Sequence, residues 1–390
     1  MQQLFRSTTL WLMPYILLFS GLVWCIVELT FLRDDIIFQS DRLVVLNKLD
    51  NWAHQRPQTD DAQEKSVLFL SSSLGLVAAN CADYKKYGQP DPNSQQAVIY
   101  SKFKCLDDQF AALMNQRTQT INLSNSAALI SEDLLLAREA LRLRGKPAMI
   151  ILGIAPRDFL DHCTADYHRS RLAHILLTRL SPFWQPSKSF LENIDTVLCK
   201  IWPFYSQRVE HRNIIIQLTC EYFHRSPDLF LAAQTFKNPT NGSNTKKKEG
   251  VSTAGKAFSD ETAEEEALVK YDNSYRDRYL PIDEKRWHIE LDSLYEFIDL
   301  CDEQKIQLVI VGMPLTERNR KLLPAAFLKE YNTALKAATT GKPTVHFINL
   351  IDDPQFLISD YSDTVHLRSN GSKKLIEILI AEIKKGRWLQ

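Results

Sequence analysis

The sequence predicts an α/β fold: a mostly parallel, five-stranded sheet with helices on both faces, extended by a helical insertion and an N-terminal transmembrane helix. Three observations support this prediction. Short apolar runs alternate with helical patterns along the chain, as they do in βαβ units. A long stretch of different composition, residues 167–280, interrupts this alternation, and an apolar segment lies near the N-terminus, before the first strand. The 390 residues are enough to bury a full hydrophobic core.

The apolar segment from Leu10 to Leu32 contains a single charged residue, Glu28. A bilayer core requires about 20 apolar residues of helix, whereas the apolar region of a cleaved signal peptide has roughly 7 to 15. No small-residue cleavage site follows, so we expect an uncleaved anchor at residues 10–32, with a cleaved signal peptide as the alternative. Glu28 lies near the helix end, where its side chain reaches the interface. Residues 1–9 form a tail and 33–64 a polar tether, and the flanking charges do not decide the orientation.

Five apolar runs after the tether have the length of buried parallel strands. Helical patterns lie between them, most clearly in Glu132–Arg144, in the stripe from Leu291 to Ile298 and in the stripe from Leu375 to Ile383. Strands that alternate with helices pair in parallel, because each helix carries the chain back to the start of the next strand. The predicted strands are Ser66–Leu70, Gln119–Leu123, Pro147–Ile154, Ile306–Met313 and Thr344–Leu350.

The insertion, residues 167–280, divides the α/β domain into residues 65–166 and 281–390. Its first part, up to residue 231, has helical and aromatic patterns. Its residues 237–266 are rich in Asn, Gly, Ser, Thr and charged side chains, which predicts a disordered loop. The aromatic helices suit a lid over a site, a surface that rests on a membrane, or additional core, and the sequence leaves these alternatives open.

The charge balance and the cysteine spacing argue against two classes of function, nucleic-acid binding and metal binding. Lys plus Arg and Asp plus Glu each number 47, and no basic block is interleaved with aromatic residues, which argues against a nucleic-acid partner. The seven cysteines form no C-x-x-C pair, and no histidine stands at zinc-ligand spacing from them. We therefore expect neither a metal nor an organic cofactor. The cysteines outside the apolar segment are expected as disulfides or as buried thiols.

Two polar clusters stand at predicted strand ends. The first strand runs into Ser71, Ser72 and Ser73 within VLFLSSSLGL, and Asp363 and His366 follow the fifth strand within YSDTVHLRS. Because the carboxyl ends of parallel strands meet at one edge of a sheet, we expect the two clusters to lie together. A carboxylate near a histidine orients the imidazole as a base for a serine hydroxyl. Either motif alone is common in turns. The hypothesis of a serine nucleophile activated by His366 therefore depends on the expectation that both clusters lie at the same edge of the sheet.

These motifs resemble those of the SGNH/GDSL hydrolase superfamily, in the membrane-anchored branch that includes DltD-like and DUF1574 proteins. The resemblance covers roughly residues 66–387 without most of the insertion. The family's blocks fall in order on Ser71–Ser73, on NLSNSA, which ends at Ala127, on GIAPRDF, which contains Arg157, and on Asp363 and His366.

The resemblance implies a three-layer, flavodoxin-like SGNH fold and assigns roles to individual residues. Three positions depart from the family pattern, since Ser71 and Ala127 replace glycines and Arg157 replaces an asparagine. Ala127 keeps a backbone N–H to donate, whereas Ser71 is expected to crowd its turn. Arg157 has two open interpretations: a contact to an oxyanion or anionic substrate, or a structural ion pair with Asp158. The implied catalytic residues are Ser73, His366 and Asp363, and the implied oxyanion or substrate residues are Ala127, Arg157 and Asn125.

The resemblance also implies a single-pass, signal-anchored membrane protein whose catalytic domain is extracytoplasmic, on the periplasmic side of a bacterial inner membrane. It implies a serine esterase or O-acyltransferase that acts on a cell-envelope glycan or related polymer through an acyl-serine intermediate, beside a membrane-bound O-acyltransferase. The alternative is a non-catalytic scaffold of the same fold, which binds a polymer or assists such an acyltransferase. The sequence does not specify the acyl group, the acceptor or the direction of transfer.

Overall fold

The computed structural model describes residues 36–54, 65–88, 100–115, 117–161, 170–181, 197 and 265–389. The chain divides into two compact units. The larger unit, Ser40–Ala173 with Ser252–Gln390, contains the sheet and every side chain discussed below. The smaller unit consists of Met1–Gln39 and His174–Val251, of which the structure describes residues 36–39, 174–181 and 197.

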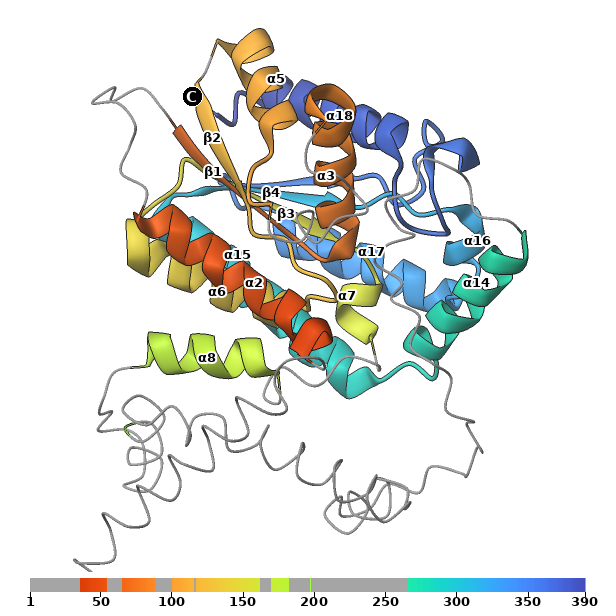
Figure 1. Ribbon diagram of the computed structural model, residues 1–390. Coiled ribbons are helices and arrows are strands. Elements are labelled where there is room, and N and C mark those ends of the chain that lie inside the picture. The colour runs from red at the N-terminus through yellow and green to blue at the C-terminus, as the bar shows by residue number, and fades with distance from the viewer. Residues whose placement is uncertain are drawn as a thin grey trace, which may run out of the picture. The chain divides into compact units, whose positions relative to one another are not determined.

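A five-stranded sheet in the order β2-β1-β3-β4-β5 forms the centre of the larger unit (Figure 1). Every neighbouring pair is parallel, which confirms the predicted α/β class and the parallel sheet. Each predicted strand is present, with its ends within two residues of the prediction. The strands are β1 (Lys65–Ser71), β2 (Thr118–Asn122), β3 (Met149–Ile154), β4 (Gln307–Gly312) and β5 (Val345–Asn349).

The central strands are continuous apolar runs because helices cover both of their faces. All residues of β3 are buried, and Ile151 lies between Phe69 of β1 and Val309 of β4 in the sheet register. The outer strands carry more polar residues, such as Thr120 in β2 and His346 in β5. This pattern is expected for a parallel sheet that is buried on both sides.

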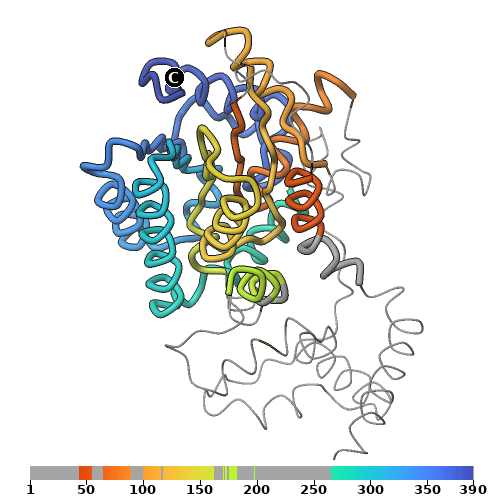
Figure 2. Tube along the Cα trace, turned by 90° about the vertical axis from the view of Figure 1, so that its left-hand side faces the viewer, coloured from red at the N-terminus to blue at the C-terminus, as the bar shows by residue number. Residues whose placement is uncertain are grey.

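Helices form one layer on each face of the sheet. Helix α18 packs against α3 and α5 on one face, and α6 packs against α15 on the other, where α17 also lies (Figure 1). Figure 2, turned by a right angle, shows α6 and α15 side by side. The layers are α3 (Ser73–Tyr87), α5 (Lys104–Met114) and α18 (Ser369–Gly386), and α6 (Ile130–Arg144), α15 (Glu284–Gln304) and α17 (Ala325–Thr339). The shorter elements are α7 (Arg157–Leu160), α16 (Glu317–Arg320) and η2 (Ile358–Asp360).

The strand order places a topological switch point between β1 and β3. The chain leaves β1 toward β2 on one side and returns to β3 on the other. In open α/β sheets the crevice outside the carboxyl ends of the strands at such a point is the usual ligand site. Ser71 ends β1 and pairs with Gly153 in β3, so the switch point lies directly beside the serine cluster.

The predicted polar tether, residues 33–64, differs from the structure because it contains helix α2 (Ile36–His54). Val45, Leu49 and Trp52 repeat at helical spacing and are buried. Arg144 of α6 donates to the Trp52 carbonyl oxygen at 3.1 Å, and its guanidinium lies over the Trp52 ring. These contacts make residues 44–54 part of the folded unit rather than a spacer.

Several predictions lie wholly or partly outside the described residues. No helix in the described ranges is long and apolar enough to cross a membrane, and the predicted anchor at residues 10–32 lies outside those ranges. Of the insertion, the structure describes α8 (Arg171–Leu180) and α14 (Glu265–Tyr279). Helix α14 contains the last two residues of the predicted disordered loop, 237–266, and the remainder of that loop lies outside the described residues. Cys81, Cys105 and Cys301 are buried free thiols.

Candidate active site

Ser73 is the first residue of helix α3, directly after the bend that ends β1. Ser72 precedes it in an extended conformation as the N-cap. The backbone N–H groups of the first turn have no partner within the helix, and the helix dipole favours negative charge there. Ser73 is partly exposed, whereas Ser71 and Ser72 are buried. Of the three serines, Ser73 alone is therefore both accessible and placed where an alkoxide is stabilised.

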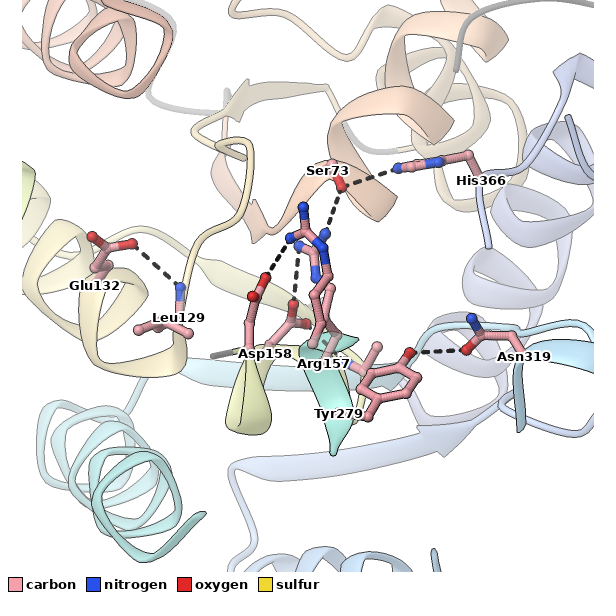
Figure 3. A network of polar contacts seen from close by, with 11 residues as sticks. Ser73, Leu129, Glu132, Arg157, Asp158, Tyr279, Asn319 and His366 are labelled. Carbon is pink, nitrogen blue, oxygen red and sulfur yellow. Dashed lines mark hydrogen bonds and ion pairs between the residues drawn. The ribbon is translucent and has the colours of Figure 1, made fainter. Parts of the chain in front are cut away.

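His366 and Asp363 lie beside Ser73, although the three residues come from opposite ends of the domain. The Ser73 Oγ is 3.0 Å from His366 Nε2, and His366 Nδ1 is 2.6 Å from Asp363 Oδ2. Asp363 and His366 are buried in the loop between η2 and α18. The structure thus joins the two polar clusters in one hydrogen-bonded chain, of which Figure 3 shows the contact between Ser73 and His366.

The loop geometry fixes the charge of Asp363 and the tautomer of His366. The backbone N–H groups of Val365 and His366 both donate to Asp363 Oδ1 at 2.8 Å. Burial alone raises the pKa of the carboxyl, but its electrostatic interaction with His366 and these hydrogen bonds outweigh it, so the pKa of Asp363 lies below its ordinary value. An ionised carboxylate only accepts, so the imidazole Nδ1 carries the proton. Nε2 is then free to accept from the Ser73 hydroxyl.

Arg157 reaches Ser73 from the other side. It begins helix α7 after β3, is buried, and donates from Nη1 to Ser73 Oγ at 3.2 Å and from Nη2 to Asp158 Oδ1 at 3.4 Å (Figure 3). Burial opposes its charge, but nearby Asp158 and Asp161 keep the pKa of the guanidinium above its ordinary value. Arg157 thus forms the predicted ion pair with Asp158 and also contacts the candidate nucleophile, while a contact to an oxyanion or anionic substrate stays a prediction.

Asp158 is held by the end of β3. Its Oδ2 accepts from the backbone N–H of Ala155 at 2.8 Å, and the residue is almost fully buried. Burial raises the pKa of its carboxyl to about 6, while the charge of Arg157 acts in the opposite direction.

Ser71 fits where the family pattern has glycine because two other residues are glycines. Ser71 is fully buried, and a Cβ built at Gly75 or at Gly153 would lie 2.7 Å from its hydroxyl oxygen. The crowding expected at Ser71 is thus relieved in α3 and in β3 rather than at Ser71 itself.

Asn125 and Ala127 lie in the loop after β2, at the same edge of the sheet. The backbone N–H of Asn125 donates to the Ser71 carbonyl oxygen at 2.9 Å, which ties this loop to the end of β1. Ala127 has a φ of 55°, in the left-handed region that favours glycine. The position where the family pattern has glycine therefore has a backbone conformation that suits glycine.

Helix α14 supplies neighbours that the sequence motifs did not indicate. Tyr275 is buried close enough to Asp363 and Arg157 for both charges to act on its pKa, which burial raises. Arg278, one turn along, donates to Asp161 after α7 at 2.7 Å. These residues belong to the insertion and match no hydrolase block. The one sequence signal is the spacing of Leu268, Asp272, Tyr275 and Tyr279, which all lie on the buried side of the helix.

A separate group of buried carboxyls lies between α6 and α15. Glu290 accepts from the backbone N–H of Ser131 at 2.8 Å and from its hydroxyl at 3.0 Å. Burial raises the pKa of Glu290 to about 7, against the lowering effect of those hydrogen bonds.

Nowhere in the described part of the chain do three His, Cys, Asp or Glu side chains come together so as to hold a metal ion.

Comparison with protein-family models gives no match, and comparison with curated proteins gives none either. The resemblance to SGNH hydrolases stays a prediction made from the motifs. The geometry of the site is independent of that resemblance. A partly exposed serine at a helix N-terminus, an oriented imidazole and a guanidinium are groups that nucleophilic acyl transfer can use.

Proposed function

We propose that the protein is a serine esterase or O-acyltransferase with an SGNH-like domain that forms an acyl ester on Ser73. The observation that carries this proposal is the chain of hydrogen bonds from Ser73 through His366 to Asp363 at the carboxyl edge of the sheet. Both distances fall within or near the range of about 2.6 to 3.2 Å that a nucleophile and its base require.

In the first half-reaction, Ser73 Oγ attacks the carbonyl carbon of an ester while His366 Nε2 takes the hydroxyl proton. Asp363 keeps the imidazole in the correct tautomer and stabilises the imidazolium. The oxyanion receives hydrogen bonds from the backbone N–H groups of Ser73 and Ala127 and from the Arg157 guanidinium. When the intermediate collapses, the carbon–oxygen bond to the leaving alcohol breaks, and the imidazolium returns the proton to that oxygen.

In the second half-reaction, a hydroxyl group or a water attacks the acyl-Ser73 ester, and His366 again removes the proton. Transfer to a hydroxyl makes the protein an O-acyltransferase, and transfer to water makes it an esterase. The acceptor that we propose is a cell-envelope glycan or related polymer, reached from a membrane anchor at residues 10–32 on the extracytoplasmic side. A membrane-bound O-acyltransferase is the proposed partner. The acceptor, the extracytoplasmic side and the partner depend on the family resemblance, whereas the anchor is predicted from the apolar segment itself.

A fluorophosphonate probe tests the proposal, because it reacts with activated serine hydroxyls and stays attached. We expect the wild-type protein to be labelled and the Ser73→Ala variant to remain unlabelled. Ser372→Ala is the matched control: this serine is buried in α18, and its hydroxyl has no hydrogen-bond partner among the described residues. The control variant should be labelled at the wild-type rate.

If the folded wild-type protein is not labelled by the probe, the proposed enzymatic function is refuted. That result would favour the non-catalytic scaffold, which needs the fold but not an activated serine. Labelling that persists in Ser73→Ala would place the reactive group elsewhere. Circular dichroism and thermal unfolding of each variant separate these outcomes from a loss of folding.

A further inference from the structure

The guanidinium of Arg157 is held in place by few contacts. Arg157 is buried, and its two hydrogen bonds, to Ser73 Oγ at 3.2 Å and to Asp158 Oδ1 at 3.4 Å, are long. Its Nε has no hydrogen-bond partner in the described part of the chain. With only two hydrogen bonds to described residues, the guanidinium depends on each of them for its direction.

Asp158, in contrast, is rigid. Its side chain is short and buried, and one carboxylate oxygen is fixed by the Ala155 N–H at 2.8 Å, just beyond the end of β3. Consecutive residues of a helix do not face each other. For Arg157 and Asp158 to pair, the long arginine side chain must therefore fold back toward the carboxylate. The pairing selects one direction for the guanidinium, and that direction leads to Ser73.

Loss of this contact leaves Arg157 with another carboxylate to approach. Asp161 follows α7 and is close enough for its charge to act on the guanidinium. Asp161 already pairs with Arg278 at 2.7 Å and accepts from Arg286 through its carbonyl oxygen. We expect Arg157 to turn toward Asp161 when Asp158 loses its charge, which would move the cation away from Ser73.

We propose that Asp158 is a positioning residue for the candidate reaction, which acts by holding the Arg157 guanidinium against Ser73 Oγ. This inference rests on the proposed function of Ser73. The nucleophile then lies between two oriented pairs: the Asp363 carboxylate directs the imidazole that takes the proton, and the Asp158 carboxylate directs the cation that meets the developing negative charge.

The proposal predicts coupling between Asp158 and Arg157. Asp158→Asn keeps the size of the side chain and an acceptor for the Ala155 N–H but removes the charge. We expect it to slow fluorophosphonate labelling by about tenfold or more, up to the roughly hundred- to thousand-fold loss expected when a donor to the oxyanion is removed. In an Arg157→Met background the same substitution should change the rate by less than about twofold, because the group that it positions is already gone.

The pH profile gives a readout that a structural role alone would not move. The charged and titratable groups that act on Asp158 are Arg157 and Asp161 on its own segment, Asp133 of α6, Tyr279 of α14 and Tyr331 of α17. The Ser72 side chain and the hydrogen bond from the Ala155 N–H also lower its pKa. Burial raises the pKa of Asp158 to about 6, so protonation of this carboxylate below that pH adds to protonation of the imidazole base in reducing the rate. The wild-type rate should fall more steeply than tenfold per pH unit below about pH 6, and the Asp158→Asn rate no more than tenfold.

Asp83→Asn is the matched control, because Asp83 is a buried carboxylate that accepts backbone N–H groups of Lys104 and Cys105 at the other end of α3. It should change stability but not the labelling rate. Equal slowing by Asp158→Asn in the wild-type and Arg157→Met backgrounds would overturn the proposal. If the single variant does not fold, the comparison of Arg157→Met with the double variant, in which both charges are absent, still tests it, and equal rates uphold it.

Failure of the proposed function is distinguishable from failure of this inference. If the wild-type protein is not labelled, a crystal structure of Asp158→Asn tests the positioning directly. Arg157 displaced from Ser73 Oγ would uphold the role of Asp158 without catalysis. Arg157 still within hydrogen-bond distance of Ser73 Oγ would refute it.

Discussion

Gly75 is the position where the structure tolerates a side chain least near the candidate nucleophile. It lies in the first turn of α3, two residues after Ser73. A Cβ there would lie 2.4 Å from Ser71 Cβ and 2.9 Å from Phe69 Cε1, whereas ordinary contacts begin at 3.4 Å. In Gly75→Ala, helix α3 must therefore move by about 1 Å, which as overpacking costs about 1 to 3 kcal/mol.

The same movement acts on the site. The distance from Ser73 Oγ to His366 Nε2 is 3.0 Å, and an increase of about 1 Å takes it beyond hydrogen-bond reach. A misplacement of this size reduces reaction rates by about a hundredfold. We therefore expect Gly75→Ala to lower both the free energy of unfolding, measured with urea, and the rate of fluorophosphonate labelling.

A second substitution tests the cause. Ser71→Gly removes the two atoms nearest to the new methyl group, so the double variant Gly75→Ala, Ser71→Gly should regain most of the labelling rate. Gly88→Ala is the control at the other end of α3, where a Cβ meets nothing within 4 Å and the φ of 69° alone penalises alanine. It should cost stability but leave labelling unchanged. Wild-type stability and labelling in Gly75→Ala, or no recovery in the double variant, would refute the reasoning.

Two further predictions concern parts of the fold outside the site. Glu290 binds its proton more tightly in the folded chain, so it should contribute a loss of stability as pH rises from about 4.5 to 7; Glu290→Gln should remove this contribution and gain on the order of 3 kcal/mol over the wild type at pH 8. Urea unfolding at a series of pH values measures both, and an unchanged slope in the variant contradicts the assignment. Leu49→Ala in α2 should lower the free energy of unfolding by about 2 to 5 kcal/mol, because Leu49 is fully buried. A change near zero would instead support the prediction that residues 33–64 are a polar tether outside the core.

The sheet was predictable because strands buried on both faces are continuous apolar runs in the sequence. A run such as that of β3, buried at every residue, has no polar side to alternate with, and helices separate it from its neighbours. The meeting of Ser73 with Asp363 and His366 follows from the same logic, since parallel strands share one carboxyl edge. Topology thus brought together residues that the sequence separates widely.

What the sequence did not reveal depends on partners rather than on local pattern. In α2, Val45, Leu49 and Trp52 form a short stripe whose meaning depends on the α6 surface that it meets. Tyr275 became a neighbour of the site only because α14 packs against α7. Local pattern places Arg157 near the site but does not decide how one long side chain divides its donors between two acceptors.

The free-energy cost of burying charged groups at the site is an argument for the proposed enzyme rather than for the alternative, a non-catalytic scaffold. The carboxylate of Asp363 and the guanidinium of Arg157 are both buried, and both are linked to the hydroxyl of Ser73, Asp363 through His366 and Arg157 directly. Buried ion pairs contribute little net stability, because desolvation offsets their attraction, and apolar side chains of similar size often serve a fold as well or better. A scaffold that needs only the sheet and its helices gains nothing from two buried charges directed at one serine. Clustering of such charges is instead typical of sites where a proton moves and negative charge develops, and a serine poised between them is the group that such chemistry would use.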